Sequence, residues 1–166
     1  WKSSIIFSEV GFEYQIIFLD SFENFDGTKI FQKAIRETRK IKFTKSIFIL
    51  GNLHTYPIAM YAAAKFYELL GFDAHFERIE QFSHMELFSA NKGDTVIIFE
   101  EKNNHNKQLT RNLKQVGINV VHHNMPSEKL PQMLYCIFFS QMVTLFEAKK
   151  KRKKDCHFVT AKKIRN

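Results

Sequence analysis

The residues SIFILGNLHTYPIAMYAAAKFYELLGFDAHFERIEQFSHMELF, numbers 46–88, decide the fold. The run SIFILG is β-branched and aromatic and stops at Gly51, which is typical of a buried parallel strand. A helix over residues 57–70 is predicted next, because Thr55 fits its N-cap and Gly71 its C-cap. The glycine turn between strand and helix exposes backbone N–H groups. It is therefore the first place to look for a site that binds an anion or a sugar hydroxyl.

Strands alternate with helices along the rest of the chain. The expected strands cover residues 46–51, 73–77, 95–101 and 118–123, and the expected helices lie within residues 22–42, 57–70, 84–89, 104–116 and 128–148. This alternation predicts an α/β fold, a three-layer αβα sandwich with a mainly parallel sheet of the flavodoxin-like or Rossmann-like kind. Ligands of such folds bind beyond the carboxyl ends of the strands. Residues 51–56, 76–84 and 100–104 should meet at that edge.

Composition agrees with one compact domain. The chain has 166 residues, of which 45% are hydrophobic and 25% charged, so it is neither disordered nor membrane-like in composition. No apolar run approaches the roughly 20 residues of a membrane-spanning helix, and no signal peptide is visible. Cys136 and Cys156 lack the spacing of metal ligands and read as reduced thiols. We expect a cytoplasmic protein with no membrane partner, no metal site and no cofactor.

The net charge of +8 raises the question of nucleic-acid binding. Much of the charge comes from KKKRKK, residues 149–154, which follows a long apolar helical segment. Lysines there complement the negative end of a helix dipole. The alternative is a weak phosphate- or nucleic-acid-binding surface. Because no RNP motif, zinc finger or helix-turn-helix pattern accompanies the charge, nucleic acid is not the expected partner.

Residues 51–88 also resemble a known family. They resemble the second sugar-isomerase (SIS) domain of glutamine–fructose-6-phosphate aminotransferase, and archaeal SIS proteins, where G-x-G-x-x-Y-P-I-A precedes a helix ending K-x-x-E and then a histidine. Residues 56–90 align with this pattern without a gap, and the C-terminal DCHFVTAKKIRN is similar to the family's tail, D-x-P-R-N-L-A-K-S-V-T. The resemblance implies that residues 25–166 form a SIS domain with a C-terminal active-site tail. Residues 1–24 resemble the end of a first SIS domain and would be its remnant.

The resemblance implies an aldose–ketose isomerase acting on a phosphorylated sugar of the fructose-6-phosphate or glucosamine-6-phosphate type. Glu68 falls on the catalytic glutamate and would be the base that moves a proton between C1 and C2. Lys65 falls on the helix lysine of the family, and Lys162 falls on the tail lysine that would hold the open chain. His84 falls on the histidine that opens the sugar ring. In the family that histidine serves a neighbouring subunit, so a homodimer is implied.

Each of these residues also has an ordinary structural interpretation. Glu68 could be a surface glutamate and Lys65 only its ion-pair partner, and His84 could be a structural histidine. If Glu68 is partly buried at the negative end of its helix, its pKa should rise towards a useful range. In the strand–helix turn, Asn52, His54 and Thr55 are candidate contacts for a sugar hydroxyl or phosphate; the alternative is a capping turn.

The departures from the family pattern leave two hypotheses. The family's phosphate loop, S-x-S-G-x-T, has no counterpart, and the corresponding edge reads FEEKNNHNKQ, whose Glu100 and Glu101 would repel phosphate. The turn reads G-N-L-H rather than G-x-G, and Tyr61 replaces a helix glutamate. No glutamine-hydrolysing domain is present, so we expect no glutaminase activity. The chain is either the isomerase half of a SIS enzyme or a non-catalytic module for phosphosugar binding, dimerisation or regulation.

Overall fold

The computed structural model describes residues 26–39, 41, 43, 46–157 and 159. Their elements, in chain order, are α2 (Gly27–Thr38), β1 (Ile47–Gly51), η2 (Leu53–Thr55), α3 (Tyr56–Lys65), η3 (Phe66–Leu70), β2 (Ala74–Arg78), α4 (Ile79–His84), η4 (Glu86–Phe88), β3 (Thr95–Ile98), α5 (Asn104–Gln115), β4 (Asn119–Val121) and α6 (Lys129–Lys150). The expectations for residues 1–24 and for Lys162 lie outside the described residues.

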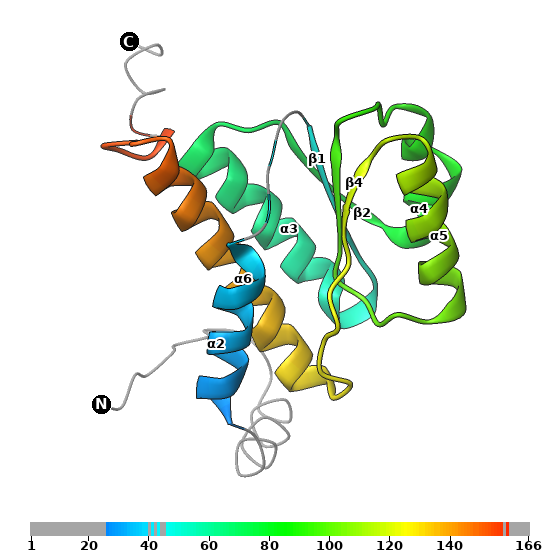
Figure 1. The fold of residues 1–166 in the computed structure, drawn as a ribbon, viewed down its shortest axis with the longest axis horizontal. Helices are drawn as coiled ribbons and strands as arrows, with labels where there is room; N and C mark the ends of the chain where they lie inside the picture. The colour runs from blue at the N-terminus through cyan, green and yellow to red at the C-terminus, as the bar shows by residue number, and fades with distance from the viewer. Residues whose placement is uncertain (1–25, 40, 42, 44–45, 158, 160–166) are drawn as a thin grey trace.

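The four described strands form one parallel sheet in the order β2-β1-β3-β4. Ile47 of β1 is level with Ala74 of β2 and Thr95 of β3, and Thr95 is level with Asn119 of β4. Figure 1 shows α2, α3 and α6 on one side of this sheet and α4 and α5 on the other. The predicted α/β sandwich with a parallel sheet is confirmed.

Two hydrophobic cores hold the layers together because side chains alternate along β1. Ile47 and Ile49 point to the face that α2, α3 and α6 cover, and Phe48 and Leu50 point to the opposite face. All five residues of β1 are buried, as expected for a central strand between two helical layers. β1 is therefore a rigid support for the turn that follows it.

The helix after β1 changes its hydrogen-bonding pattern before it ends. α3 covers Tyr56–Lys65, and the next residues, Phe66–Leu70, form a π-helical turn that ends at Gly71. Gly71 has φ 68°, a left-handed conformation that suits glycine, so the predicted C-cap is confirmed. Short π-helical turns are rare and occur frequently at functional sites.

One expected helix was misplaced. Residues 84–89 were expected to be helical, but α4 covers Ile79–His84 and is followed by a short 3-10 turn, Glu86–Phe88. The helix starts earlier because the side chain Oδ1 of Asn52, from the turn after β1, accepts the N–H of Ile79 at 3.3 Å. A residue 27 positions away thus satisfies an otherwise unpaired donor at the start of this helix.

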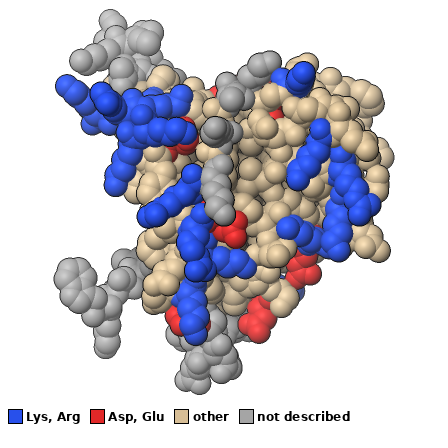
Figure 2. Space-filling view, in the orientation of Figure 1, with Lys and Arg blue, Asp and Glu red and all other residues tan. Residues whose placement is uncertain are grey.

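The basic block extends the end of α6 and is partly structural. α6 carries Lys149 and Lys150 in its last turn, where cations complement the helix dipole. Lys153 Nζ donates to the carbonyl of Leu70 at 2.7 Å and so caps the end of the π-helical turn. Figure 2 shows Lys and Arg gathered at this end of α6 and along α2. No helix in the described part of the chain is long and apolar enough to cross a membrane.

Candidate functional site

The turn from β1 into α3 begins at a glycine that the geometry requires. A Cβ on Gly51 would lie 2.7 Å from the backbone oxygen of Thr55, so only glycine lets the chain fold back this tightly. The Thr55 hydroxyl accepts the N–H of Asn52 at 2.9 Å, and the N–H of Thr55 donates to the Asn52 carbonyl at 2.9 Å. Thr55 stands at the N-cap of α3, as predicted, but its side chain caps nothing in that helix. It holds the turn closed instead.

A carboxylate of the protein itself fills the donor side of this turn. Glu100, which follows β3, accepts the N–H of Asn52 at 3.1 Å through Oε1. The Thr55 hydroxyl also donates to this oxygen. The sequence predicted these same groups as hydrogen-bond donors to a phosphate or a sugar hydroxyl. Because Glu100 already occupies them, an anionic ligand would have to displace this carboxylate to bind there.

The other side chains of the turn are also engaged or face outwards. His54 Nε2 lies 2.6 Å from Oε1 of Gln132, a side chain of α6 that is 2% exposed. Leu53 stands where the family has its second glycine, and it has φ 45°, which a leucine adopts only at a cost. Its side chain is 88% exposed at the edge of the turn. Leucine therefore replaces glycine at a position that still requires left-handed backbone.

Behind Glu100, a buried histidine fixes the loop that carries it. Nε2 of His122 lies 3.0 Å from the carbonyl oxygen of Glu100, and Nδ1 lies 3.0 Å from Oγ1 of Thr110. Burial lowers the pKa of His122, against the opposing effect of its hydrogen bond to the Glu100 backbone. A neutral imidazole is thus part of the support for Glu100 at neutral pH.

Lys65 and Glu68 form a pair at the far end of the same helix. Lys65 Nζ lies 2.5 Å from Oε2 of Glu68, and the hydrogen bond to that carboxylate raises the pKa of the lysine. Glu68 belongs to the π-helical turn, and its side chain is 48% exposed. The Glu68 side chain is therefore about half-buried. The Lys65 ammonium also lies 5.4 Å from the centre of the Tyr61 ring, and the Tyr61 hydroxyl accepts a hydrogen bond from Gln141 of α6.

Among the described residues, the predicted site residues do not gather at one place. Thirteen residues separate Thr55 from Glu68, which corresponds to about 20 Å along a helix axis. A hexose phosphate is shorter than this, so one molecule cannot touch both groups. His84 is exposed at the end of α4, and α4 begins beside Asn52. Glu68, the candidate base, and the turn after β1 are therefore too far apart to belong to one sugar-phosphate site.

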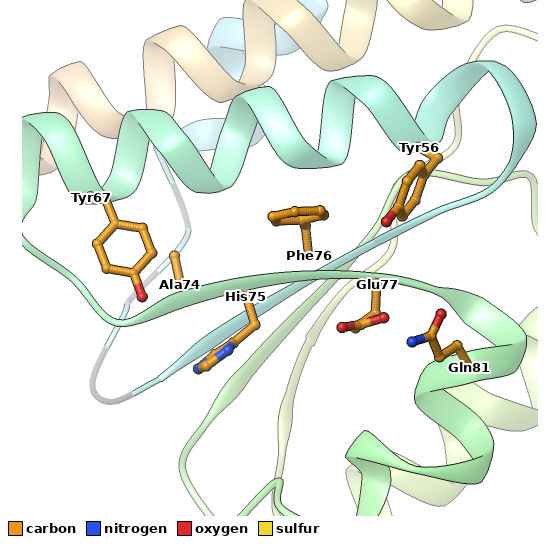
Figure 3. Close-up of a pocket in the computed structure, with 7 residues that line it drawn as sticks. All are labelled: Tyr56, Tyr67, Ala74, His75, Phe76, Glu77 and Gln81. Atoms are coloured by element: carbon orange, nitrogen blue, oxygen red, sulfur yellow. The ribbon is translucent and has the colours of Figure 1, made fainter.

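A pocket that sequence reasoning missed runs beside β2. It has a volume of about 480 Å³ and is lined by Tyr56, Tyr67, Ala74, His75, Phe76, Glu77 and Gln81. Figure 3 shows Phe76 between the two tyrosines on the α3 side of the strand, with His75 and Glu77 on the other side. Only an aromatic excess hinted at it in the sequence. Within the described residues no three His, Cys, Asp or Glu side chains are placed to hold a metal ion.

The same fold occurs in solved structures of proteins from phosphosugar metabolism. A Clostridium difficile 630 protein, proposed to be a phosphosugar isomerase, superposes with a TM-score of 0.65 and 19% identity over 86% of this chain and 45% of its own. Glucosamine-6-phosphate deaminase from Thermotoga maritima gives 0.63 and 14% over 75% and 42%. Tagatose-6-phosphate ketose/aldose isomerase from Escherichia coli gives 0.52 and 17% over 68% and 39%.

The chain spans less than half of the length of each of these three structures. Because their sequence identities to this chain are below 20%, the likeness establishes the fold alone. No curated protein matches the sequence. A sequence model of the SIS domain matches residues 40–122, half of the chain, a range that includes all four strands and the turn, the Lys65–Glu68 pair and His84. The chain belongs to the SIS domain family.

Proposed function

We propose that the chain is a phosphosugar-binding SIS domain with aldose–ketose isomerase chemistry. The observation that carries the proposal is the Lys65–Glu68 pair, whose charged atoms lie 2.5 Å apart where α3 passes into the π-helical turn, with 28% and 48% of the two side chains exposed. These two residues fall on the helix lysine and the catalytic glutamate of the family pattern. A partly exposed ion pair contributes little to stability, and π-helical turns occur frequently at functional sites, so we propose that this pair contacts a ligand.

In this proposal each residue has one chemical task. The Glu68 carboxylate takes a proton from C1 or C2 of the open-chain sugar and returns it to the neighbouring carbon. Lys65 keeps its proton, since its pKa is raised, and can donate to a sugar or phosphate oxygen. His84 opens the ring, and its exposed position at the end of α4 leaves it accessible to a site on another subunit. Lys162 holds the open chain.

The groups that bind the phosphate of the ligand have to lie outside the turn after β1. Glu100 fills that turn, and its negative charge repels a phosphate. Glu68 lies about 20 Å away along the helix, too far for the donors of that turn to hold a phosphate bound beside it. We therefore propose that a second SIS unit completes the site, either in a homodimer or in a longer chain.

Proton exchange tests the chemistry. Fructose-6-phosphate and glucosamine-6-phosphate are incubated with the protein in D₂O, and the C1 and C2 proton signals are followed by NMR. We expect the signal of at least one sugar to decay with the wild type and to persist with Glu68→Gln. Glu80→Gln, which changes an exposed glutamate on α4, is the matched control and should exchange at the wild-type rate. Wild-type exchange by Glu68→Gln would remove Glu68 as the base.

A second candidate function is phosphosugar binding or dimerisation without catalysis. The observation that favours it is the closed turn, in which Glu100 occupies the donors and Leu53 replaces a glycine. A non-catalytic module of this kind would broaden the NMR lines of the sugar phosphate without exchanging its C1 or C2 protons. Exchange lost with Glu68→Gln would exclude it.

We also propose that the protein works in the cytoplasm. Neither Cys136 nor Cys156 forms a disulfide, and Cys136 is fully buried. Burial raises the pKa of the Cys136 thiol far above its usual range, so it stays protonated and unreactive. A chain that requires a disulfide for folding would contradict this location. Denaturation with and without a reducing agent checks it, and the two curves should coincide.

A further inference from the structure

We propose that α2 and the end of α6 form one basic surface that binds the phosphate backbone of nucleic acid. The sequence shows two separate clusters of cations, at residues 29–39 and 149–154, and each alone is typical of a solvated helix surface. The structure joins them, because α2 packs along α6. The inference is independent of the proposed sugar site, since it uses other residues and needs no isomerase chemistry.

Two ring contacts fix α2 on α6 and set the position of its cations. The rings of Phe31 and Phe138 pack edge to face with 5.3 Å between their centres. At the end of α2, the Arg39 guanidinium lies 5.8 Å from the centre of the Phe146 ring. Phe146 is less than one turn before the basic block at residues 149–154. The cations of α2 therefore continue into those at the end of α6.

One face of α2 carries a row of cations. They are spaced three or four residues apart, about one per turn, and include the residue after the helix: Lys29, Lys33, Arg36 and Arg39. Only Lys29 forms an ion pair with a described carboxylate, that of Asp26 at 3.3 Å. Like charges at this spacing destabilise a helix, and Lys29 lies at the positive end of the helix dipole. The row is therefore not explained by the stability of α2.

The basic block at the end of α6 has cations to spare. Lys150 lies 2.9 Å from a carboxylate of its own helix, Lys151 lies 4.7 Å from the centre of an aromatic ring, and Lys153 caps the π-helical turn. The other three are exposed and form no ion pair with a described residue: Lys149, Arg152 and Lys154. Figure 2 shows Lys and Arg from the end of α6 down along α2.

The charge of the chain is concentrated on this surface. Residues 26–39 and 147–155 hold ten Lys and Arg against four Asp and Glu, which makes six of the net eight positive charges. A single sugar phosphate needs far fewer cations than this. A long row of cations on one face matches a partner that repeats a phosphate along its length, and arginine is well suited to phosphate recognition.

A membrane surface fits the same charges less well. A helix that binds in the membrane interface inserts an apolar face between the lipids. The apolar residues Ile30 and Ala34 of α2 are instead buried in the core that α2 shares with α6. What α2 presents to solvent is its cations, so nucleic acid is the better match.

Fluorescence anisotropy of a labelled RNA of about 20 nucleotides, titrated with the full chain, measures the binding. We expect the affinity to fall steeply between roughly 50 and 200 mM salt. The slope of log K against log salt should be about −3, which corresponds to about four phosphates on a single strand. Single-stranded DNA of the same length should bind within about tenfold of the RNA, because the surface contacts phosphates and not the 2′-hydroxyl.

Three double variants locate the surface. Arg36→Gln with Arg39→Gln should weaken binding about tenfold at low salt and make the slope shallower by about 1 to 1.5. Lys149→Gln with Arg152→Gln should do the same without touching α2. Lys107→Gln with Arg111→Gln is the matched control, because it removes the same charge from exposed positions of α5, on the other side of the sheet, and should bind nearly as the wild type does.

Four results would overturn the proposal. They are no binding at low salt, an equal loss of affinity in the α5 control, an affinity that both other double variants leave unchanged, and tighter binding to phosphatidylserine vesicles than to RNA. The second would mean that only the net charge of the chain attracts RNA, and the last would assign the surface to a membrane. None of these results bears on proton exchange at the sugar, so the proposed isomerase function stands or falls separately.

Discussion

Two buried threonines offer a matched pair for testing how the turn after β1 is held. Thr55 and Thr95 are both 0% exposed. The Thr55 hydroxyl accepts the N–H of Asn52 and donates to Glu100, whereas Oγ1 of Thr95 has no hydrogen-bond partner among the described residues. Valine has the shape of threonine without the hydroxyl. The same substitution should therefore have opposite effects at the two positions.

The magnitudes follow from the contacts. Thr55→Val loses one neutral hydrogen bond and one bond to a carboxylate, together about 2.5 kcal/mol of the free energy of unfolding. Thr95→Val removes a buried hydroxyl that gains nothing from burial, and should raise the free energy of unfolding by about 1 kcal/mol. At the size of this chain, these changes correspond to roughly 5–10 °C lower and 2–4 °C higher in Tm.

Urea denaturation of the wild type and both variants, followed by far-UV circular dichroism, measures the two free energies side by side. A Thr55→Val variant as stable as the wild type would refute the hydrogen-bonded lock between the turn and Glu100. Equal losses of unfolding free energy at both threonines would show that valine disturbs the packing at either site. Such a result would not support the hydrogen bonds between the turn and Glu100 as the cause of the loss at Thr55.

Three further perturbations report on the same region. Gly51→Ala should cost about 2–3 kcal/mol, because its Cβ would meet the Thr55 backbone at 2.7 Å, and a normal denaturation midpoint would contradict this. Leu53→Gly should be neutral or stabilising by up to about 1 kcal/mol, since relief of the φ 45° conformation outweighs glycine's extra freedom when unfolded; a clear loss would show that the leucine side chain makes contacts that matter. Burial lowers the pKa of both His122 and His123 below 6.5, so the unfolded chain takes up protons first. Stability should be constant above about pH 6.5 and fall as the pH drops from there towards the lowered pKa values, and urea midpoints between pH 8 and 5 that stay level would contradict the burial of the two rings.

The layers of the fold could be predicted from local sequence. The apolar run up to Gly51 and the glycine C-cap at Gly71 bracket β1 and the helix after it, and both signals depend on neighbouring residues only. The π-helical turn at Phe66–Leu70 could not be predicted, because an i to i+5 pattern leaves no distinct hydrophobic period in five residues. The start of α4 depends on Asn52, a contact no local pattern carries.

The candidate site was predictable as a set of residues and not as an arrangement. The sequence aligned Lys65 and Glu68 with a family motif at helical spacing, and the structure pairs them. The acidic residue type at position 100 indicated an edge unfavourable for phosphate. The hydrogen bonds of the Glu100 carboxylate with Asn52 and Thr55 could not be predicted, because these two residues lie 45 or more positions earlier in the chain. The sheet topology makes that contact, since β1 and β3 are neighbours and their carboxyl ends meet.

The first measurement to make is a titration of the isotope-labelled protein with fructose-6-phosphate, followed by amide NMR shifts, with inorganic phosphate as the control ligand. We predict that the sugar phosphate shifts the amides of residues 65–68 and leaves those of 52–55 in place, because Glu100 fills the turn after β1. Shifts concentrated at residues 52–55, or the same shifts with phosphate alone, would contradict a phosphosugar site built around Lys65 and Glu68.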